Sequence, residues 1–330
     1  MAERAVVLEG TGGVWRVLTA DGDVRDVSLR GRLKKSNAGR RADGSLRRDT
    51  VRAGLETVKL AVGDEVLVEP DERGDVWAIA EILPRRSRLA RRRPGGGFGE
   101  RVVVANIDQV VVVFAAAEPE PHPRMIDRFL VIAEGNALPA RLVVNKVELV
   151  DAAATRERFA GYERAGYPVH LVSARQRLGL DELHAALDGR VSALTGPSGV
   201  GKSSLINALY PGIDLRVGEI SRSVMKGRHT TVGALLTPLP SAGGRPAGFV
   251  ADTPGLREVG LWGLPVRELD RLFPEFRPHL DHCRFADCTH RQEPDCAVRA
   301  AVAAGEISAE RYDSYLKLRD ELAELESQGW

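Results

Sequence analysis

Residues 191–209 read VSALTGPSGVGKSSLINAL and contain the pattern that decides the fold. An apolar stretch of strand length, 191–195, leads into a loop that matches G-x-x-x-x-G-K-[ST], and a helical pattern follows the loop. A glycine-rich loop in this position directs backbone N–H groups at one spot, where the positive end of the helix dipole adds to them. The stretch therefore predicts a phosphate-binding loop in an α/β fold.

Each residue type in this loop has a physical reason to be there. Gly199 and Gly201 let backbone N–H groups close around phosphate oxygens without a Cβ clash. Lys202 is expected to reach the β- and γ-phosphates, and the Ser203 hydroxyl to coordinate Mg²⁺. The alternative, a chance glycine-rich turn, does not explain why strand, helix, lysine and serine coincide. The predicted nucleotide contacts of the loop are Gly196, Pro197, Ser198, Gly199, Val200, Gly201, Lys202, Ser203 and Ser204.

Two patterns upstream of the loop bear on which base the nucleotide carries. Residues 143–148 read VVNKVE and resemble the NKxD motif of GTPases, whose acid accepts hydrogen bonds from guanine N1–H and the N2 amino group. Here the acid is Glu148, one methylene longer than aspartate. A helix-capping loop is the alternative for this motif alone, but residues 173–174 end the next strand and match the Ser-Ala loop that backs guanine in the same enzymes. The predicted base contacts are Asn145, Lys146, Val147, Glu148, Ser173 and Ala174.

Two segments downstream of the loop match the parts of a GTPase that sense the γ-phosphate. Residues 252–255 read DTPG after an apolar strand and match DxxG, in which Asp252 holds the Mg²⁺ shell through water and the Gly255 N–H meets the γ-phosphate. Residues 227–231 read GRHTT, where a GTPase needs a threonine to close over Mg²⁺. Thr230 and Thr231 are both candidates, and the sequence does not choose between them.

The residue after the DxxG glycine predicts slow catalysis. Many GTPases place a glutamine there to orient the attacking water. This chain has Leu256, which offers no hydrogen-bonding group, so we expect a slow intrinsic rate and an activating partner. His229 could supply a polar group, although a solvent-exposed loop histidine explains it equally well.

The order of the motifs indicates a circular permutation. Base recognition (145–148, then 173–174) precedes the phosphate loop (196–203) and the DTPG segment, whereas ordinary GTPases have the phosphate loop first. The fold tolerates this order if the usual ends are joined, here through residues 188–190, and new ends open after the second switch. Whatever follows residue 255 is then attached directly to the segment that senses the γ-phosphate.

The N-terminal part reads as a small β-barrel. Five short strands within residues 4–84 are separated by Gly- and Asp-rich turns, which fits an OB-fold. From residue 102, Val-rich strands alternate with helical stretches, as in a parallel sheet covered on both faces. We expect three domains: a barrel with its linker (1–98), a circularly permuted α/β GTPase domain (99–260) and a helical, zinc-bearing domain (261–330).

Basic residues are concentrated near the barrel. Residues 30–52 contain nine Lys or Arg and two acids, and residues 85–93 contain six Arg and no acid, in a chain of net charge +1. Such runs fit contact with nucleic-acid phosphates, and a solvated loop or linker is the alternative.

The three cysteines lie within fourteen residues near the C-terminus. Together with one histidine they form the pattern C-x₄-C-x-H-x₅-C, which offers three thiolates and one imidazole, a closed tetrahedral set for structural zinc. A disulfide with a spare cysteine and buried thiols are the alternatives. His282 competes as a ligand but is adjacent to the first cysteine. The predicted ligands are Cys283, Cys288, His290 and Cys296.

The composition places the chain among cytoplasmic proteins. Hydrophobic residues make up 43% of the chain, enough for a core. No signal peptide pattern opens the chain, and no apolar run is long enough to span a bilayer. We therefore expect no membrane association.

Together these motifs resemble one family, the ribosome small-subunit-dependent GTPase A family (RsgA or YjeQ). The resemblance covers nearly the whole chain: the barrel, 145–148, 196–204, 227–231, 252–255 and the Cys/His set. It implies a late assembly factor of the small ribosomal subunit that is a monomer, binds 16S rRNA and hydrolyses GTP slowly until stimulated by the subunit. Release of other assembly factors is also implied. The departures are Glu148 and a longer basic insertion at about 36–50.

Two other functions remain open at this point. A P-loop kinase would transfer phosphate to a small acceptor, but a kinase has no use for the guanine pocket. A non-catalytic RNA-binding module with structural GTP would explain Leu256.

Overall fold

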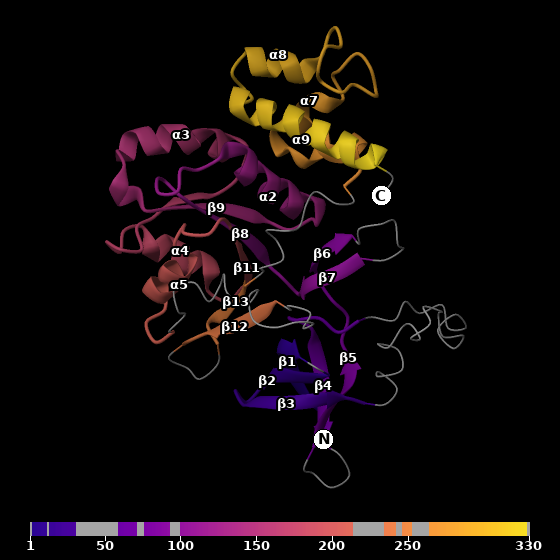
Figure 1. Cartoon of the computed structure of the whole chain (residues 1–330), viewed down its shortest axis with the longest axis vertical. Helices are drawn as coiled ribbons and strands as arrows, with labels where there is room; N and C mark the ends of the chain where they lie inside the picture. Colours follow the sequence, from indigo (N-terminus) through magenta and orange to yellow (C-terminus); the bar gives the residue numbers. More distant parts are fainter. Residues whose placement is uncertain are drawn as a thin grey trace, which may run out of the picture.

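Three units follow one another along the chain in Figure 1: a barrel at the N-terminal end, a central sheet with helices, and a C-terminal group of helices. The computed structural model describes residues 2–11, 13–30, 59–70, 76–92, 100–213, 234–241, 246–252 and 264–328. The predicted architecture, an α/β domain between an OB-like barrel and a helical segment with a Cys/His cluster, is confirmed.

The barrel consists of five strands in the order β1-β2-β3-β5-β4 and is closed. Antiparallel pairing of β1 with β4 and parallel pairing of β3 with β5 close it. Residues alternate between the interior and the outside, and the buried Val7, Val17, Val66, Val68 and Ile79 fill the interior. The strands are β1 (Glu3–Thr11), β2 (Val14–Thr19), β3 (Val24–Leu29), β4 (Glu65–Pro70) and β5 (Trp77–Ile82).

A hairpin of β6 (Arg88–Arg92) and β7 (Glu100–Ala105) connects the barrel to the sheet. The sequence predicted a linker here, because a run of arginines lacks the apolar alternation of a strand. Leu89 and Val104 supply that apolar face, and both are buried. The hairpin spans the expected boundary between residues 98 and 99.

The first two arginines of the basic run form internal ion pairs. Arg85 makes a bidentate pair with the buried Asp64, with N–O distances of 2.6 and 2.7 Å. Arg86 pairs with Asp108 and donates to the Asn106 carbonyl at 2.9 Å. These two residues therefore fasten the barrel to the sheet, and contact of the run with phosphates stays a prediction.

The central sheet has six strands in the order β10-β9-β8-β11-β13-β12. All neighbours are parallel except β12, which pairs antiparallel with β13. Residues 188–190 join α4 (Leu180–Leu187) directly to β11, as the permuted order requires. The strands are β8 (Gln109–Ala115), β9 (Ala140–Asn145), β10 (Val169–Leu171), β11 (Val191–Thr195), β12 (Leu235–Leu239) and β13 (Gly248–Asp252).

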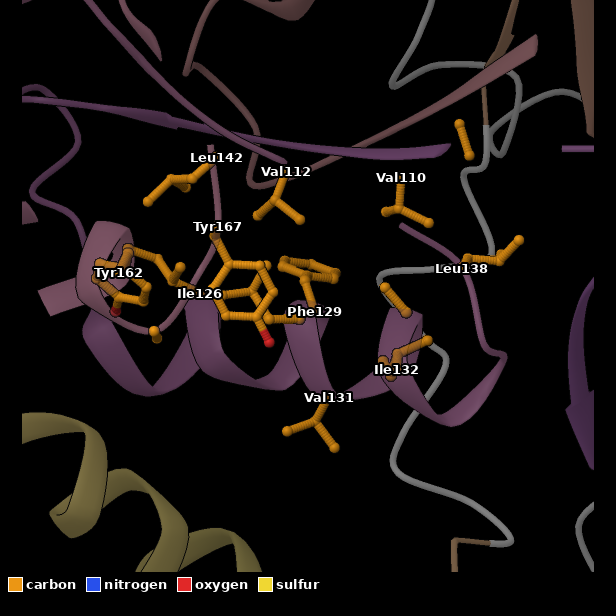
Figure 2. Close-up of a cluster of buried hydrophobic side chains, with 14 of the residues drawn as sticks. Val110, Val112, Ile126, Phe129, Val131, Ile132, Leu138, Leu142, Tyr162 and Tyr167 are labelled. Atoms are coloured by element: carbon orange, nitrogen blue, oxygen red, sulfur yellow. The ribbon is translucent and has the colours of Figure 1, made fainter. Parts of the chain in front are cut away.

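Helices cover both faces of this sheet. On one face α2 (Pro123–Gly135) and α3 (Ala152–Arg164) pack on alternate strand residues, and Figure 2 shows Val110 and Val112 pointing toward α2. On the other face α4 and α5 (Lys202–Leu209) pack on the intervening residues, such as Val111 and Val113. Burial on both faces explains the unbroken valine runs that the sequence showed.

The C-terminal segment is helical and packs on α2 rather than on the sheet. Its elements are two 3₁₀ helices, η4 (Val266–Leu272) and η5 (Pro274–Phe276), then α7 (Arg277–Leu280), α8 (Ala297–Ala303) and α9 (Ala309–Ser327). The last helix begins directly after Ser308, whose side chain makes no capping hydrogen bond. Among the described residues no helix is both long and apolar enough to cross a bilayer.

Candidate functional site

The glycine-rich loop lies at the carboxyl end of β11, between that strand and α5. Three of its residues have positive φ: Gly196 (137°), Gly199 (81°) and Gly201 (89°). A Cβ on Gly196 would lie 2.0 Å from the Val113 carbonyl oxygen, and one on Gly201 would lie 2.5 Å from the Asn145 side-chain nitrogen. A side chain at either position would therefore be strained by the positive φ and would crowd a neighbouring atom, which explains the glycines of the motif.

The lysine of the loop is buried among backbone carbonyls. Lys202 is 7% exposed, and its Nζ donates to the carbonyl oxygens of Gly196 at 2.9 Å and Pro197 at 2.7 Å. The loop thereby wraps around its own ammonium group and keeps a positive charge at the start of α5. Ser203 is also buried, in the first turn of that helix. A cation and a helix N-terminus at one spot suit a polyphosphate.

Asn145 ties three predicted segments together. It ends β9 and is 2% exposed. Its Nδ2 donates to the Val200 carbonyl of the glycine-rich loop at 2.9 Å, and its Oδ1 accepts from the Ala174 amide at 3.1 Å. Each of these side-chain atoms has capacity for one further hydrogen bond. The structure thus brings together the base-recognition motif, the Ser-Ala loop and the phosphate loop, which are up to 55 residues apart in sequence.

Lys146 and Glu148 of the base motif differ in how they are held. Lys146 takes a left-handed conformation (φ 63°), and its Nζ donates to the Glu118 carbonyl. Glu148 lies in the short 3₁₀ helix η2 (Val147–Leu149) and is half-buried. Its Oε2 is buried and has no hydrogen-bond partner within the described part of the chain. Because such an acceptor is costly to leave unpaired, it suits a ligand that presents N–H donors.

The Ser-Ala loop is closed on itself. Ser173 is fully buried, its Oγ accepts from the Gln176 amide at 2.9 Å, and its backbone pairs with Leu178. Ala174 is half-buried and leaves its amide to Asn145. This loop therefore presents backbone and a methyl group next to the base motif, a rigid wall rather than a reactive group.

Asp252 ends β13, and its backbone lies beside Leu194 in the adjacent parallel strand β11. Since the glycine-rich loop starts two residues after Leu194, the DxxG aspartate begins at the same edge of the sheet as that loop. The remaining predicted catalytic residues, His229, Thr230, Thr231 and Gly255, lie outside the described residues, as do Leu256 and most of the basic stretch 30–52.

A further segment, residues 116–122, joins this site without having been predicted. It connects β8 to α2, its Glu118 carbonyl accepts from Lys146, and Pro119 lies within 3.8 Å of where a Gly199 Cβ would be. The position of this segment in the sequence could have identified it, because it follows β8, a central strand. Ligand sites of α/β sheets lie at the carboxyl ends of such strands.

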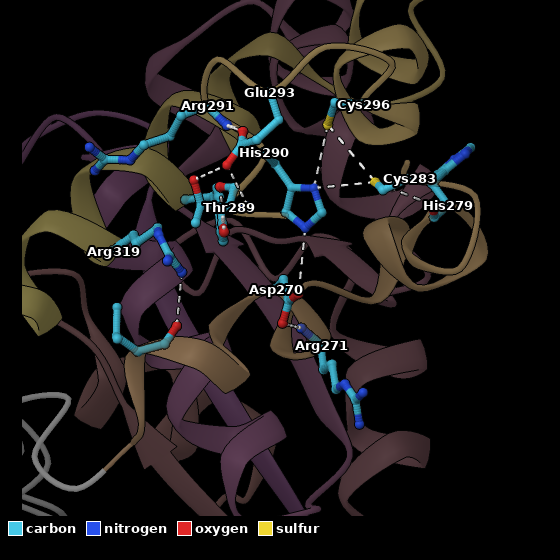
Figure 3. A network of polar contacts seen from close by, with 12 residues as sticks. Asp270, Arg271, His279, Cys283, Thr289, His290, Arg291, Glu293, Cys296 and Arg319 are labelled. Atoms are coloured by element: carbon cyan, nitrogen blue, oxygen red, sulfur yellow. Dashed lines mark hydrogen bonds and ion pairs between the residues drawn. The ribbon is translucent and has the colours of Figure 1, made fainter. Parts of the chain in front are cut away.

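The C-terminal cluster brings all four predicted metal ligands within 4.8 Å of one another. His290 Nδ1 lies 3.6 Å from Cys283 Sγ and 3.5 Å from Cys296 Sγ, and the two sulfurs are 4.0 Å apart. Figure 3 shows the imidazole facing both thiols. A tetrahedral zinc ion bonded at about 2.3 Å to sulfur and about 2.0 Å to nitrogen separates its ligands by about 3.5–3.8 Å. The donor set and its spacing therefore fit a metal ion, and His282 is not part of the cluster.

The surroundings of the cluster also fit a cation. The outer nitrogen of His290, Nε2, lies 3.4 Å from Asp270 Oδ2, which orients the ring and fixes Nδ1 as the inward atom. Burial raises the pKa of the Cys288 thiol to about 12 and also raises that of Cys296. A cation is therefore needed to hold both sulfurs as thiolates. Asp270 was missed because it precedes the motif and belongs to no local spacing.

Comparison with known proteins assigns the family. The family model of the RsgA GTPase matches residues 82–262. Small ribosomal subunit biogenesis GTPase RsgA of Gemmatimonas aurantiaca is 57% identical over 318 residues, 96% of either chain. The crystal structure of YjeQ from Thermotoga maritima superposes with a TM-score of 0.74 at 32% identity and covers 98% of this chain and 99% of that one. That of YloQ, a circularly permuted GTPase, gives 0.69 at 24% identity and covers 98% of this chain and 96% of that one. The P-loop kinase alternative loses its support, and this chain belongs to the RsgA GTPase family.

Proposed function

We propose that this GTPase acts in late maturation of the small ribosomal subunit, binds 16S rRNA, and hydrolyses GTP slowly until the subunit stimulates it. The observation that carries the nucleotide part is the double hydrogen bond of Asn145, which joins the base motif, the Ser-Ala loop and the phosphate loop into one site. The ribosomal part rests on the name of the relative that is 57% identical over nearly the full chain.

Within this site the residues take the following roles. The free carboxylate oxygen of Glu148 accepts from guanine N1–H and N2, and the Lys146 stem lies along the base. Lys202 and the N-terminus of α5 neutralise the phosphates. Ser203 and Asp252 would hold Mg²⁺, which when bound stabilises charge on the β- and γ-phosphates. Thr230 or Thr231, Gly255 and His229 complete the γ-phosphate side in this proposal.

Zinc is the metal we assign to the C-terminal cluster. Three thiolates and one imidazole form a closed set without an open coordination position, so the ion is structural rather than catalytic. Soft sulfur ligands and the near-tetrahedral spacing favour zinc over calcium or magnesium, which prefer oxygen.

The barrel is the part that we assign to rRNA, together with the basic stretch 30–52 and the arginines after Arg86. Strand β1 of the barrel packs beside β12, the strand between the predicted switch threonines and Asp252. Docking of the barrel on the subunit can therefore act on the switches through β12. We also propose that the chain forms three domains, at 1–98, 99–260 and 261–330. In this proposal the protein is a cytoplasmic monomer that takes part in the release of other assembly factors.

A direct test compares GTP and ATP hydrolysis by the purified protein, alone and with isolated small ribosomal subunits. We expect a low GTP-selective rate that rises strongly with small subunits, as a slow GTPase does with its activating partner. Large subunits serve as the control. Equal rates with and without small subunits would remove the ribosomal trigger while leaving the GTPase in place.

A second candidate, an RNA-binding module in which GTP is only structural, is favoured by one observation. Leu256 stands where many GTPases carry the water-orienting glutamine. Binding of GTP to the protein–subunit complex without release of phosphate over hours supports this candidate against the first.

Glu148 offers a prediction on base selectivity. Glu148→Gln places an amide where guanine presents two donors, so we expect GTP affinity to fall by about tenfold or more. Xanthine carries a carbonyl at C2 in place of the amino group, and XTP should therefore bind the variant better than it binds the parent protein. Nucleotide titrations measure both effects.

The matched control for this substitution is Glu157→Gln, which changes an exposed acid on α3. It should leave all affinities unchanged. An equal loss of GTP and ATP binding in Glu148→Gln would mean that Glu148 does not read the base.

A further inference from the structure

Arg311 of α9 is 2% exposed and bonds two carboxylates of other elements. Its Nη1 lies 2.5 Å from Asp127 Oδ1 on α2. Its Nε and Nη2 lie 2.7 and 3.0 Å from the two oxygens of Glu275 in η5. A buried guanidinium with two carboxylates is a rigid, directional junction, because its planar fork fixes both partners.

Aromatic rings complete this junction. The Arg311 guanidinium carbon lies 4.7 Å from the ring centre of Phe273, 5.4 Å from Tyr162 of α3 and 5.6 Å from Tyr167 before β10. These rings exclude water and strengthen the ionic contacts. Arg311 therefore joins the C-terminal segment to both helices that cover one face of the sheet.

Both of these helices hold the segment 116–122 beside the nucleotide site. Asp127 lies one turn into α2, which begins directly after this segment. On α3, Arg158 lies one turn before Tyr162; it pairs with Glu120 at 2.6 Å and donates to the Pro121 carbonyl at 3.4 Å. The junction and the segment are thus one helical turn apart on both helices. The connection through α2 is the stronger one, because the Arg158 and Glu120 side chains are 41% and 64% exposed.

The segment in turn supports the site. Its Glu118 carbonyl accepts from Lys146 Nζ, and Pro119 lies against the Gly199 position of the phosphate loop. The amide of Ala116 donates to the Asn145 carbonyl at 2.7 Å. A displacement of α2 would therefore move the base motif and the tip of the phosphate loop together.

We propose that Arg311 is a positioning residue for the nucleotide site: it fixes α2 and α3 on the C-terminal segment and thereby holds residues 116–122 against Lys146 and the phosphate loop. The inference rests on the proposed guanine site. The contacts of residues 116–122 reach the base motif and the phosphate loop. GTP and GDP both bind to these two parts of the site, so a loss of Arg311 should weaken the binding of both nucleotides equally. This connection is distinct from the covalent connection through residues 253–263, which would act on GTP alone.

The test replaces Arg311 by methionine in the full chain and measures Kd for GTP and GDP, together with kcat and KM. We expect both affinities to fall by about tenfold, the usual range for a coupled residue that touches no ligand. KM should rise by a similar factor, and kcat at saturating GTP should change much less. Arg311→Lys retains the charge and should recover part of the affinity.

Arg128→Ala is the matched control. Arg128 also joins α2 to α9, through Glu321, but both side chains are about one-third exposed, so the pair contributes little. This control should bind both nucleotides like the parent protein. Asp127→Asn, which has the same shape and keeps an acceptor, is a second test of the junction if the methionine variant does not fold. It should also lower the affinity for both nucleotides.

Each outcome separates the explanations. Unchanged affinities in a folded but less stable variant would mean that the junction is only structural. A loss of affinity for GTP alone would assign the coupling to the covalent connection through residues 253–263 and overturn the proposal. Absence of guanine-nucleotide binding in the parent protein would instead refute the proposed function itself.

Discussion

Lys202→Met is expected to reduce single-turnover GTP hydrolysis by about 10²–10³-fold, the usual loss when a preorganised charge donor is removed from a site. Methionine matches the length of the lysine stem, so the packing against α5 is kept and only the ammonium is lost. Lys202 is 7% exposed, and its ammonium group is aligned by the carbonyls of Gly196 and Pro197. The phosphates would then meet only the helix dipole and backbone N–H groups.

The measurement follows phosphate release and nucleotide affinity in the same preparation, with the melting temperature as a check on folding. Lys317→Met is the matched control, since Lys317 is half-exposed on α9 and pairs with the exposed Asp313. This control should hydrolyse GTP like the parent protein. Activity of Lys202→Met within a few-fold of the parent rate would mean that the loop does not hold the phosphates in the proposed way.

Removal of the metal is the second change with a large expected effect. Structural zinc contributes about 10–16 kcal/mol of apparent binding free energy in small zinc domains. We expect Cys296→Ser, or a strong chelator, to remove stoichiometric zinc and to unfold the segment around residues 283–296. Cys296 lies within 3.5 Å of His290 Nδ1 and is the most buried of the three thiols. Its loss leaves the coordination set of the metal incomplete.

The unfolding should extend to α9. The Tyr312 hydroxyl donates to the His290 carbonyl at 2.6 Å, and the Tyr315 hydroxyl donates to the Thr289 carbonyl at 3.1 Å. Without the metal these carbonyls are no longer fixed, so the helix that carries Arg311 is loosened at the same time. Metal analysis and a thermal melt report both steps.

Phe285→Ala serves as the control for the metal site. Phe285 is exposed in the same loop and contributes no ligand. It should retain one zinc per chain and melt like the parent protein. If the purified protein contains no zinc and Cys296→Ser melts normally, the assignment of a structural zinc ion is wrong.

Local sequence determined the parts of this protein whose geometry depends on neighbours along the chain. The loop 196–203 is such a part, because its glycines, lysine and helix start are contiguous. The Cys/His set and the valine-rich strands are others, since ligand spacing and burial on both faces leave direct marks in the sequence. The circular permutation was also evident from the order in which the motifs follow one another along the chain. The sequence did not indicate strand β12, because its residues, LLTPL, show neither alternation nor an unbroken apolar run.

Tertiary structure alone decided which distant groups meet. Arg85 and Arg86 read as part of a phosphate-binding run, yet they pair with Asp64 and Asp108, about twenty residues away. The Arg85 side chain thereby becomes largely buried, whereas that of Arg86 stays half-exposed. The pair of Arg311 with Asp127 spans 184 residues. A charge or a carbonyl carries no local mark of its eventual partner, because the pairing depends on which surfaces the folded elements bring together. That is why candidate nucleotide contacts could be proposed from the sequence, whereas the residues that hold them in place could not.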